Sequence, residues 1–467
     1  MQGISESAHA FGQEIFGQAG WHAATAARWT RIAAGLLRHP APFVTAAFRD
    51  EAEQTAVFRQ LRSSNLTVDD VVTAVSDATA RKAAAESVVI VPIDGSSIAI
   101  RDVDGRKGAG LQSTRSMIAW GFKVMTAIAV TITGVPIGVA GLFWWTRPRS
   151  IPKRTADEKN RRRKSKTVME KESGHWFRLL DAIVARMSAF APTCTPWFQM
   201  DRGADIAELL HHITQRKLLA TIRLAHERRD VSAAHRTQLQ SVRRARSLGE
   251  YALEIPSGRK RAQRQARMSV RACEVAIRIP RTKLTVTINV VHTREVRTTP
   301  HDEAPLEWFL YTTAPIRTLD QCTSVIDAYA MRWSIESFHN AWKSGGTRVE
   351  QTQLRSETAI LKWATVLAAV SLRAIRLAKL GRETPDVPAT TEFNKHEIEA
   401  TILLRKPKGI RIGHVPNMAQ MVRWVADLGG YAGSRARTPP GKTVILRGLL
   451  DVEAAARALE QRDKMNN

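Results

Sequence analysis

The hydrophobic and polar positions divide the chain into a helical beginning, a mixed middle of strands and helices, and a helical end. Apolar residues recur at helical spacing in residues 21–37 and 52–61, which predicts two helices near the N-terminus. Thr67, followed three residues later by Asp70, predicts a further helix that begins with a capping box. The same helical spacing returns in residues 356–381, near the C-terminus.

Between the two helical ends the pattern changes to that of strands. Residues 87–93 are apolar and lead into Asp94, and Gly95 with the two serines after it predicts that the chain turns outward there. Residues 125–145 carry no charge and are long enough to span a membrane. Their Val, Ile and Thr content, with the turn signal at residues 133–136, instead predicts two buried strands.

Further strands follow in the second half of this middle region. Residues 197–200 form an apolar run that leads into Asp201, and a helix is expected to start near Ile206. Hydrophobic and polar residues alternate in residues 283–291 and 306–312, which predicts antiparallel strands. The middle of the chain is therefore expected to contain a sheet with acids at the ends of two strands.

Residues 329–343 combine an apolar stripe with a charged one. Read as a helix that stops at Gly345 and Gly346, the stretch places two sets of residues on opposite faces. The apolar face holds Met331, Ile335, Phe338 and Trp342, and the polar face holds Tyr329, Arg332, Glu336 and Lys343. A carboxylate between cations suits a metal ion beside phosphate groups. The alternative is a solvated helix face with ordinary charges.

The charge balance of the whole chain narrows the class of partner. Seventy Lys and Arg residues stand against 44 Asp and Glu, a net charge of +26, which favours a polyanionic partner such as nucleic acid. A ribosome-associated or membrane-surface protein is the alternative, although the excess extends over the whole length. Residues 153–171 and 259–267 are basic stretches, and the first is expected to be a mobile loop that either grips phosphates or is only solvated.

Length and composition are those of a globular protein, since 467 residues with 44% apolar and 24% charged content suffice for two or three domains. Cys194, Cys273 and Cys322 are far apart, so neither a disulfide framework nor a zinc site is indicated and a reducing cytoplasm is expected. No secretory signal and no nucleotide-binding motif is recognised, so ATP dependence is not expected.

The spacing Tyr-x2-Arg-x3-Glu-x6-Lys over residues 329–343, together with the neighbouring Trp333, Phe338 and His339, resembles the signature of the IS4-family DDE transposases. This resemblance implies the α/β class with a ribonuclease-H-like catalytic core, a β-strand insertion, and helical N- and C-terminal domains. The implied divisions are a DNA-end-binding domain (1–75), the first part of the core (76–235), the insertion (236–320), the second part of the core (321–382) and a dimerisation region (383–467).

The resemblance also implies a catalytic triad of Asp94, Asp201 and Glu336, which would bind two Mg²⁺ or Mn²⁺ ions. Gly203 departs from the family's Asp-Arg-Glu-Ala-Asp motif, where it replaces the Glu. Asp205, the other acid of that motif, is expected to be a charge at a helix start.

The residues expected to bind DNA, by the same resemblance, are Tyr329, Arg332, Lys343, Trp308, Arg28 and Arg31. For Trp308 the implied role is stacking on a flipped base, and the alternative is ordinary packing in a strand.

The implied function is that of a cut-and-paste DNA transposase. It would bind inverted-repeat ends as a homodimer, cleave through a hairpin intermediate and join the 3′ ends to target DNA. Double-stranded DNA would be the partner, without membrane or nucleotide, in a bacterial cytoplasm at the nucleoid. A non-catalytic DNA-binding regulator or transposition inhibitor of the same family is the alternative.

Overall fold

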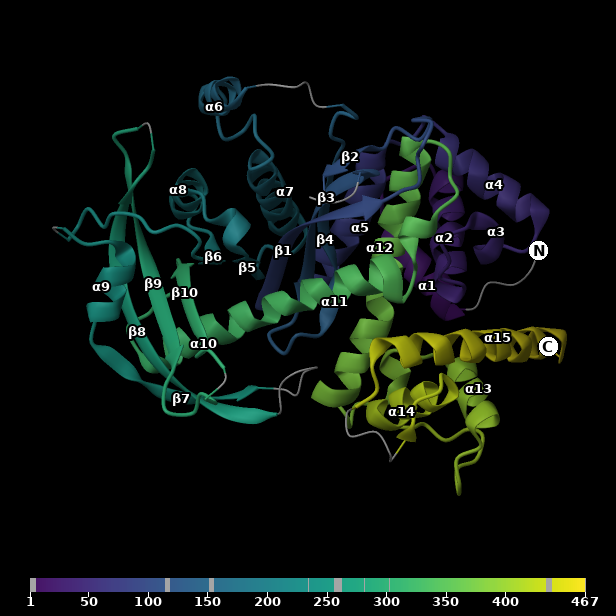
Figure 1. The fold of residues 1–467 in the computed structure, drawn as a ribbon. Helices are drawn as coiled ribbons and strands as arrows, with labels where there is room; N and C mark the ends of the chain where they lie inside the picture. The colour runs from purple at the N-terminus through teal and green to yellow at the C-terminus, as the bar shows by residue number, and fades with distance from the viewer. Residues whose placement is uncertain are drawn as a thin grey trace.

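The computed structural model describes residues 6–466, apart from 114–117, 151–154, 234, 256–262, 281, 302 and 434–438. A ten-stranded mixed sheet runs through the molecule, with helices packed on its faces and at one end (Figure 1). The α/β class expected from the sequence is confirmed. The strands are β1 (Val88–Ala99), β2 (Gly110–Ser113), β3 (Ile118–Val130), β4 (Pro136–Trp145), β5 (Thr195–Met200), β6 (Leu219–Arg223), β7 (Ser247–Ile255), β8 (Arg264–Arg278), β9 (Thr285–Glu295) and β10 (Glu307–Thr312).

The helices lie mostly before and after these strands in the chain. Their bounds are α1 (Glu6–Gly12), α2 (Ala23–Arg38), α3 (Val44–Ala47), α4 (Glu51–Arg62), α5 (Val68–Ala83), α6 (Ala156–Ser165), α7 (Gly174–Phe190), α8 (Ala207–Gln215), α9 (Gln238–Arg244), α10 (Leu319–Ala330), α11 (Ser334–Asn340), α12 (Glu357–Glu383), α13 (Lys395–Arg405), α14 (Met418–Leu428) and α15 (Lys442–Asn466).

The sheet has the order β2-β3-β1-β5-β6-β10-β9-β8-β7, and β4 also pairs with β3. β1, β5 and β6 are parallel to one another, whereas the other pairs are antiparallel. The strands predicted at 283–291 and 306–312 are β9 and β10. β10 pairs with β6, so the strand block β7–β10 expected as an insertion continues the sheet (Figure 1).

The turn expected after Asp94 is wrong. β1 continues to Ala99, and its second half, from Gly95 onward, pairs with Met125 to Gly121 of β3. The glycine and two serines are compatible with an extended backbone, and pairing with β3 satisfies their backbone groups, so tertiary contacts override the local turn preference. Asp94 therefore lies within a long strand rather than at its tip.

The uncharged run 125–145 forms strands as predicted. It covers most of β3 and all of β4, and Gly134, in the turn between them, has the positive φ of +83° that favours glycine. The described helix that is long and apolar enough to cross a membrane is α12, and 89% of its apolar window is buried inside the molecule.

The N-terminal helices expected from the sequence are also present. Thr67 caps α5 in a full capping box with Asp70. The division expected at residue 75 falls inside α5, and this helix packs directly on the sheet, where the Thr79 hydroxyl donates to the Val139 carbonyl at 2.8 Å. The helical beginning and the sheet thus share one hydrophobic core.

The basic stretch 153–171 is not the mobile loop that was expected. Residues 156–165 form α6, whose start is closed by a capping box between Thr155 and Glu158. The cap satisfies backbone donors at the helix start, which lets a highly charged segment remain helical. Residues 153–154 of this stretch and 259–262 of the other lie outside the described residues, and Arg264 begins β8.

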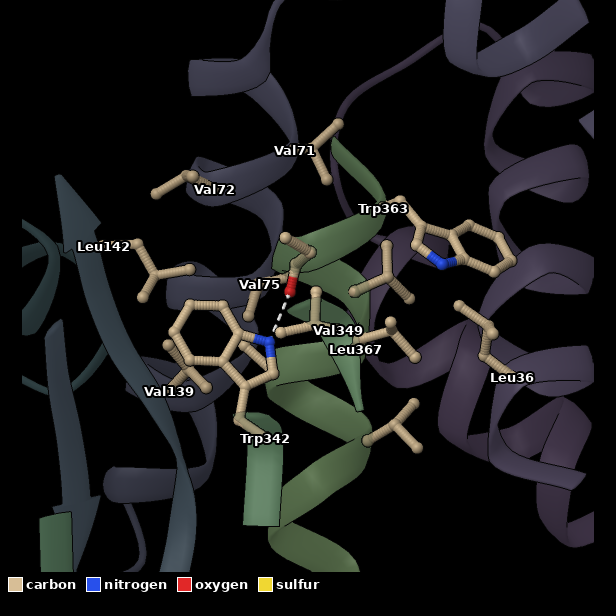
Figure 2. Packing of buried hydrophobic residues seen from close by; sticks show 14 of the residues in the cluster. Leu36, Val71, Val72, Val75, Val139, Leu142, Trp342, Val349, Trp363 and Leu367 are labelled. Atoms are coloured by element: carbon tan, nitrogen blue, oxygen red, sulfur yellow. Dashed lines mark hydrogen bonds between the residues drawn. The ribbon is translucent and has the colours of Figure 1, made fainter. Parts of the chain in front are cut away.

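α12 is the central helix of the core. Trp342 lies between this helix and the sheet, and its indole nitrogen donates to the Ala364 carbonyl at 3.0 Å (Figure 2). Trp363 is fully buried on the N-terminal side and donates to the Pro42 carbonyl at 3.2 Å. The second half of α12 packs with α13, α14 and α15, so one helix connects the sheet with both helical ends of the chain.

Truncation of Trp342 should destabilise the whole chain. Trp342→Ala is expected to lower the free energy of unfolding by about 3–5 kcal/mol, because it removes a fully buried side chain and leaves a cavity. Trp333→Ala is the matched control, since Trp333 is 58% exposed and should change stability by about 0.5 kcal/mol or less. Thermal and urea unfolding of the two variants measure the difference, and equal losses would contradict this account of the core.

Candidate active site

The stretch 329–343 is helical but not one uniform helix. α10 ends at Ala330, a tight 3-10 turn covers Met331–Trp333, α11 follows, and a wide π turn covers Ala341–Gly345. The expected stop at the two glycines is confirmed. Such local changes of helix pitch are frequent at functional sites.

The apolar stripe expected on this helical run is confirmed. Ile335, Phe338 and Trp342 are completely buried, and Met331 packs against the same core cluster from a half-exposed position. Phe338 stacks on Trp342 with ring centroids 5.5 Å apart. This packing fixes the rotation of α11 and so determines where its polar side chains lie.

Asp94 and Asp201 are brought together by the parallel pairing of β1 with β5. Ile93 is opposite Met200 in this register; Asp94 is the next residue within β1, and Asp201 directly follows the end of β5. Asp201 also accepts the Gly203 amide at 2.8 Å at the start of the 3-10 turn Arg202–Ala204. These adjacent parallel strands in the interior of the sheet therefore bring the two acids close enough for the charge of Asp201 to raise the pKa of Asp94.

Glu336 approaches Asp94 from α11 and is accompanied by a histidine. One potential ligand atom from each of Asp94, Glu336 and His339 lies within 4.8 Å of the others. Asp201 is not part of this cluster. His339 was not among the predicted site residues, although Glu-x-x-His is a spacing that puts two ligands on one helix face.

His339 is buried and is tied to the sheet. Its Nε2 lies 2.7 Å from the Thr126 hydroxyl, and that hydroxyl donates to the Asp94 carbonyl at 3.1 Å. Burial, with the positive charges of Lys343 and Arg332, lowers the pKa of His339 to about 3. The imidazole is therefore neutral at physiological pH.

Arg332 lies between the two acids of the cluster. Its Nη1 is 3.7 Å from an Asp94 carboxylate oxygen and 3.6 Å from Glu336. Both distances exceed that of a hydrogen bond, and Nε and Nη1 are buried without a hydrogen-bond partner in the described part of the chain. Unpaired buried donors are costly, so this guanidinium has capacity for a further anionic oxygen.

The electrostatics of the site disfavour a charged Asp94. Burial, followed by the negative charge of Asp201, raises the pKa of the Asp94 carboxyl to about 6. Glu336 adds to this rise, whereas Arg332 opposes it. Clustered carboxylates with an elevated pKa are a frequent feature of catalytic and metal-binding sites.

Tyr329 does not lie on an open polar face as expected. It is 2% exposed and its ring meets Trp308 edge to face at 5.9 Å. Burial raises the pKa of its hydroxyl, and the positive charges of Arg332 and of Arg223, at the end of β6, partly offset this effect. Arg223 escaped the sequence analysis because a lone arginine at a strand end carries no local signal.

The remaining predicted DNA contacts are spread over two regions. Lys343 lies in the wide turn, half-exposed and near enough to influence His339. Arg28 and Arg31 are exposed on α2 and line a groove of about 610 Å³ against α4, together with Arg38 and Arg59. The structure therefore does not bring these two arginines into the acidic site itself.

Asp205 differs from the expected charge at a helix start. Its carboxylate accepts the amides of Ala225 and His226 at 2.7 and 2.8 Å and pairs with Arg228 at 2.5 Å. α8 begins only at Ala207, and Asp205 has no exposed side-chain surface. These contacts anchor the loop after β6 and commit Asp205 to structure, which leaves Asp201 as the acid available for chemistry.

The donor set fits a divalent cation. Carboxylates from β1 and α11 converge within reach of one ion, and a third directly follows the adjacent strand β5. Burial, and after it the charges of Asp201 and Glu336, raise the pKa of Asp94, and a bound cation would stabilise its charged form. No model of a known protein family matches the sequence.

Replacement of Asp94 should stabilise the metal-free protein at alkaline pH. The carboxyl titrates near 3.8 when unfolded and near 6 when folded, so its burial costs stability as pH rises through this range. With a chelator present, the free energy of unfolding of Asp94→Asn is expected to exceed that of wild type by on the order of 2–3 kcal/mol at pH 8 and by little at pH 4. Thermal unfolding across pH measures this difference.

Asp104→Asn is the control for this experiment, because Asp104 is exposed on a loop. It should follow wild type at every pH. Added Mg²⁺ should raise the Tm of wild type and of the control more than that of Asp94→Asn. A destabilised Asp94→Asn variant at pH 8 would contradict the assigned electrostatics.

Proposed function

We propose that this chain is a metal-dependent DNA phosphoryl transferase of the DDE transposase type. The observation that carries the proposal is the position of Asp94, which lies in one cluster with Glu336 of α11 and near enough to Asp201, after the adjacent parallel strand, for the charge of Asp201 to raise its pKa. Phosphoryl transfer with paired divalent cations needs carboxylates in this kind of arrangement. The signature spacing of residues 329–343 points to the same chemistry.

The strand order supports a ribonuclease-H-like core. In the part of the sheet β4-β3-β1-β5-β6, three strands are parallel and β3 and β4 are antiparallel to their neighbours. α7 and α8 pack on one face of this part, and the helical run with Glu336 and α12 lies on the other. The first acid then lies within β1, the second directly follows the neighbouring β5, and the third comes from the covering helix.

Each residue of the site has a chemical task under this proposal. Asp94, Asp201 and Glu336 would hold Mg²⁺ or Mn²⁺, which supplies charge stabilisation and an activated attacking oxygen when bound. Arg332 would turn its unpaired donors to a phosphate oxygen of the substrate. Arg223 and Tyr329 would fix the guanidinium of Arg332, and Lys343 would contact phosphate one turn further along.

The surfaces of the protein fit a long duplex. The net charge of +26 favours DNA through counterion release. Arg28, Arg31 and the exposed helix α6 lie outside the acidic site and would bind flanking phosphates. The proposed course is nicking at the transposon end, attack of the freed 3′-hydroxyl on the opposite strand to form a hairpin, hydrolysis of that hairpin, and joining to target DNA by two protomers.

Asp201→Asn provides the direct test. On a duplex carrying the inverted repeats that flank the gene, wild type should cleave only with Mg²⁺ or Mn²⁺, and the variant should lose cleavage but retain end binding within a few-fold. Most of the affinity comes from the basic surfaces rather than from the acids. Gel shift and cleavage on the same duplex measure both properties.

Asp104→Asn, an exposed acid, is the matched control and should cleave like wild type. A wild-type chain that binds the ends but never cleaves them would instead support a non-catalytic regulator. Full cleavage by Asp201→Asn would remove this residue from the site.

Trp308 tests whether base stacking accompanies the reaction. Trp308→Ala should reduce hairpin formation more than first-strand nicking, because only the hairpin requires the strand to be distorted; one stacked base contributes about 1–3 kcal/mol. The measurements are the ratio of nicked to hairpin product and the Tm. Since Trp308 contacts Tyr329, a lowered Tm with an unchanged ratio would leave Trp308 as packing alone.

A further inference from the structure

The hydrogen bonds around Thr126 favour one tautomer of His339. The Thr126 hydroxyl has one proton, which it donates to the Asp94 carbonyl. A proton on Nε2 lets His339 donate to this hydroxyl at the same time, whereas in the other tautomer His339 and the Asp94 carbonyl would compete for the single hydroxyl proton. In this tautomer Nδ1 keeps its lone pair, which is the form of the ring nitrogen that coordinates a metal ion.

This arrangement is the one in which histidines bind metals. A ligating imidazole usually donates its other ring N–H to a fixed acceptor, which orients the ring and sets the tautomer. Here the acceptor is the Thr126 hydroxyl. Thr126 is fixed in β3, directly opposite Asp94 of β1. His339 follows Glu336 by three residues and is 8% exposed, so the ring has little freedom to turn away.

We infer that His339 is a metal ligand of this site, through the ring nitrogen that does not donate to Thr126. The inference rests on the proposed function and extends it to the identity of the ion. An ion held by Asp94, Glu336 and His339 has mixed oxygen and nitrogen donors. Mg²⁺ prefers oxygen alone, whereas imidazole suits first-row transition ions, so this position favours Mn²⁺ over Mg²⁺.

The competing explanation is that His339 only connects α11 to β3 through Thr126. If this is its only role, a side chain of similar size that keeps a hydrogen-bond donor should replace the imidazole without any change in metal affinity or metal preference. A direct spectroscopic readout of nitrogen beside the metal separates the two roles.

The experiment uses the full chain with Mn²⁺ alone and pulsed EPR to detect nitrogen coupling to the bound ion. Wild type should show coupling from one histidine nitrogen, and ¹⁵N-histidine labelling should change it. His339→Gln should lose the coupling, bind Mn²⁺ about 10–100-fold more weakly, and bind Mg²⁺ with a smaller change. His212→Gln is the control, because His212 lies on α8 and pairs with Asp181 instead.

Thr126→Val serves as a second variant, since it removes the acceptor and leaves the imidazole. This variant should lower the affinity for Mn²⁺ several-fold without abolishing the nitrogen coupling. If His339→Gln does not fold, the wild-type spectrum still decides, because it needs no variant.

The outcomes separate this inference from the proposed function. If Mn²⁺ binding depends on Asp94 but the EPR spectrum shows no nitrogen coupling, His339 is not a ligand. The proposed metal-dependent cleavage would still stand in that case. Absence of any Mn²⁺ or Mg²⁺ binding that depends on Asp94 and Glu336 overturns both.

Discussion

The docking of one helical run on one face of the sheet is the contact on which the rest of the structure depends. Trp342 meets Trp144 of β4 at 5.7 Å, stacks on Phe338 and donates to the backbone of α12. Glu336 lies less than two turns before this anchor. The buried Trp342 therefore stabilises the core and also determines the position of the Glu336 carboxylate relative to the sheet. Changes in this helical run are for this reason expected to affect both stability and the acidic site.

The side chains of the candidate site destabilise the folded protein. A carboxyl with a pKa raised to about 6 costs free energy that a purely structural packing would avoid. The same holds for a buried guanidinium with two nitrogens that have no hydrogen-bond partner among the described residues. Such local violations are expected where binding, rather than folding, determined the residues. A bound cation and a phosphate oxygen would relieve both at once, the cation through the acids and the phosphate through Arg332.

The sequence predicted the elements better than it predicted the environment of individual side chains. The buried stripe Ile335, Phe338 and Trp342 and the cap at Thr67 follow from local periodicity and local hydrogen bonds, so they could be read directly. The residue at which β1 ends could not be predicted from the sequence, because it depends on pairing with β3, which is distant in the chain. The burial of Tyr329 escaped for the same reason, since its neighbours Trp308 and Arg223 come from distant strands.

Two acids of one short segment show how far sequence reasoning reaches at the candidate site. Asp201 and Asp205 are four residues apart, and either could have been the ligand from sequence alone. The structure distinguishes them by their partners. Asp205 is saturated by Arg228 and two amides, whereas Asp201 accepts the Gly203 amide and lies near enough to Asp94 to raise its pKa. Hydrogen-bond saturation, which depends on the loop after β6, is thus the property that separates a structural acid from an available one.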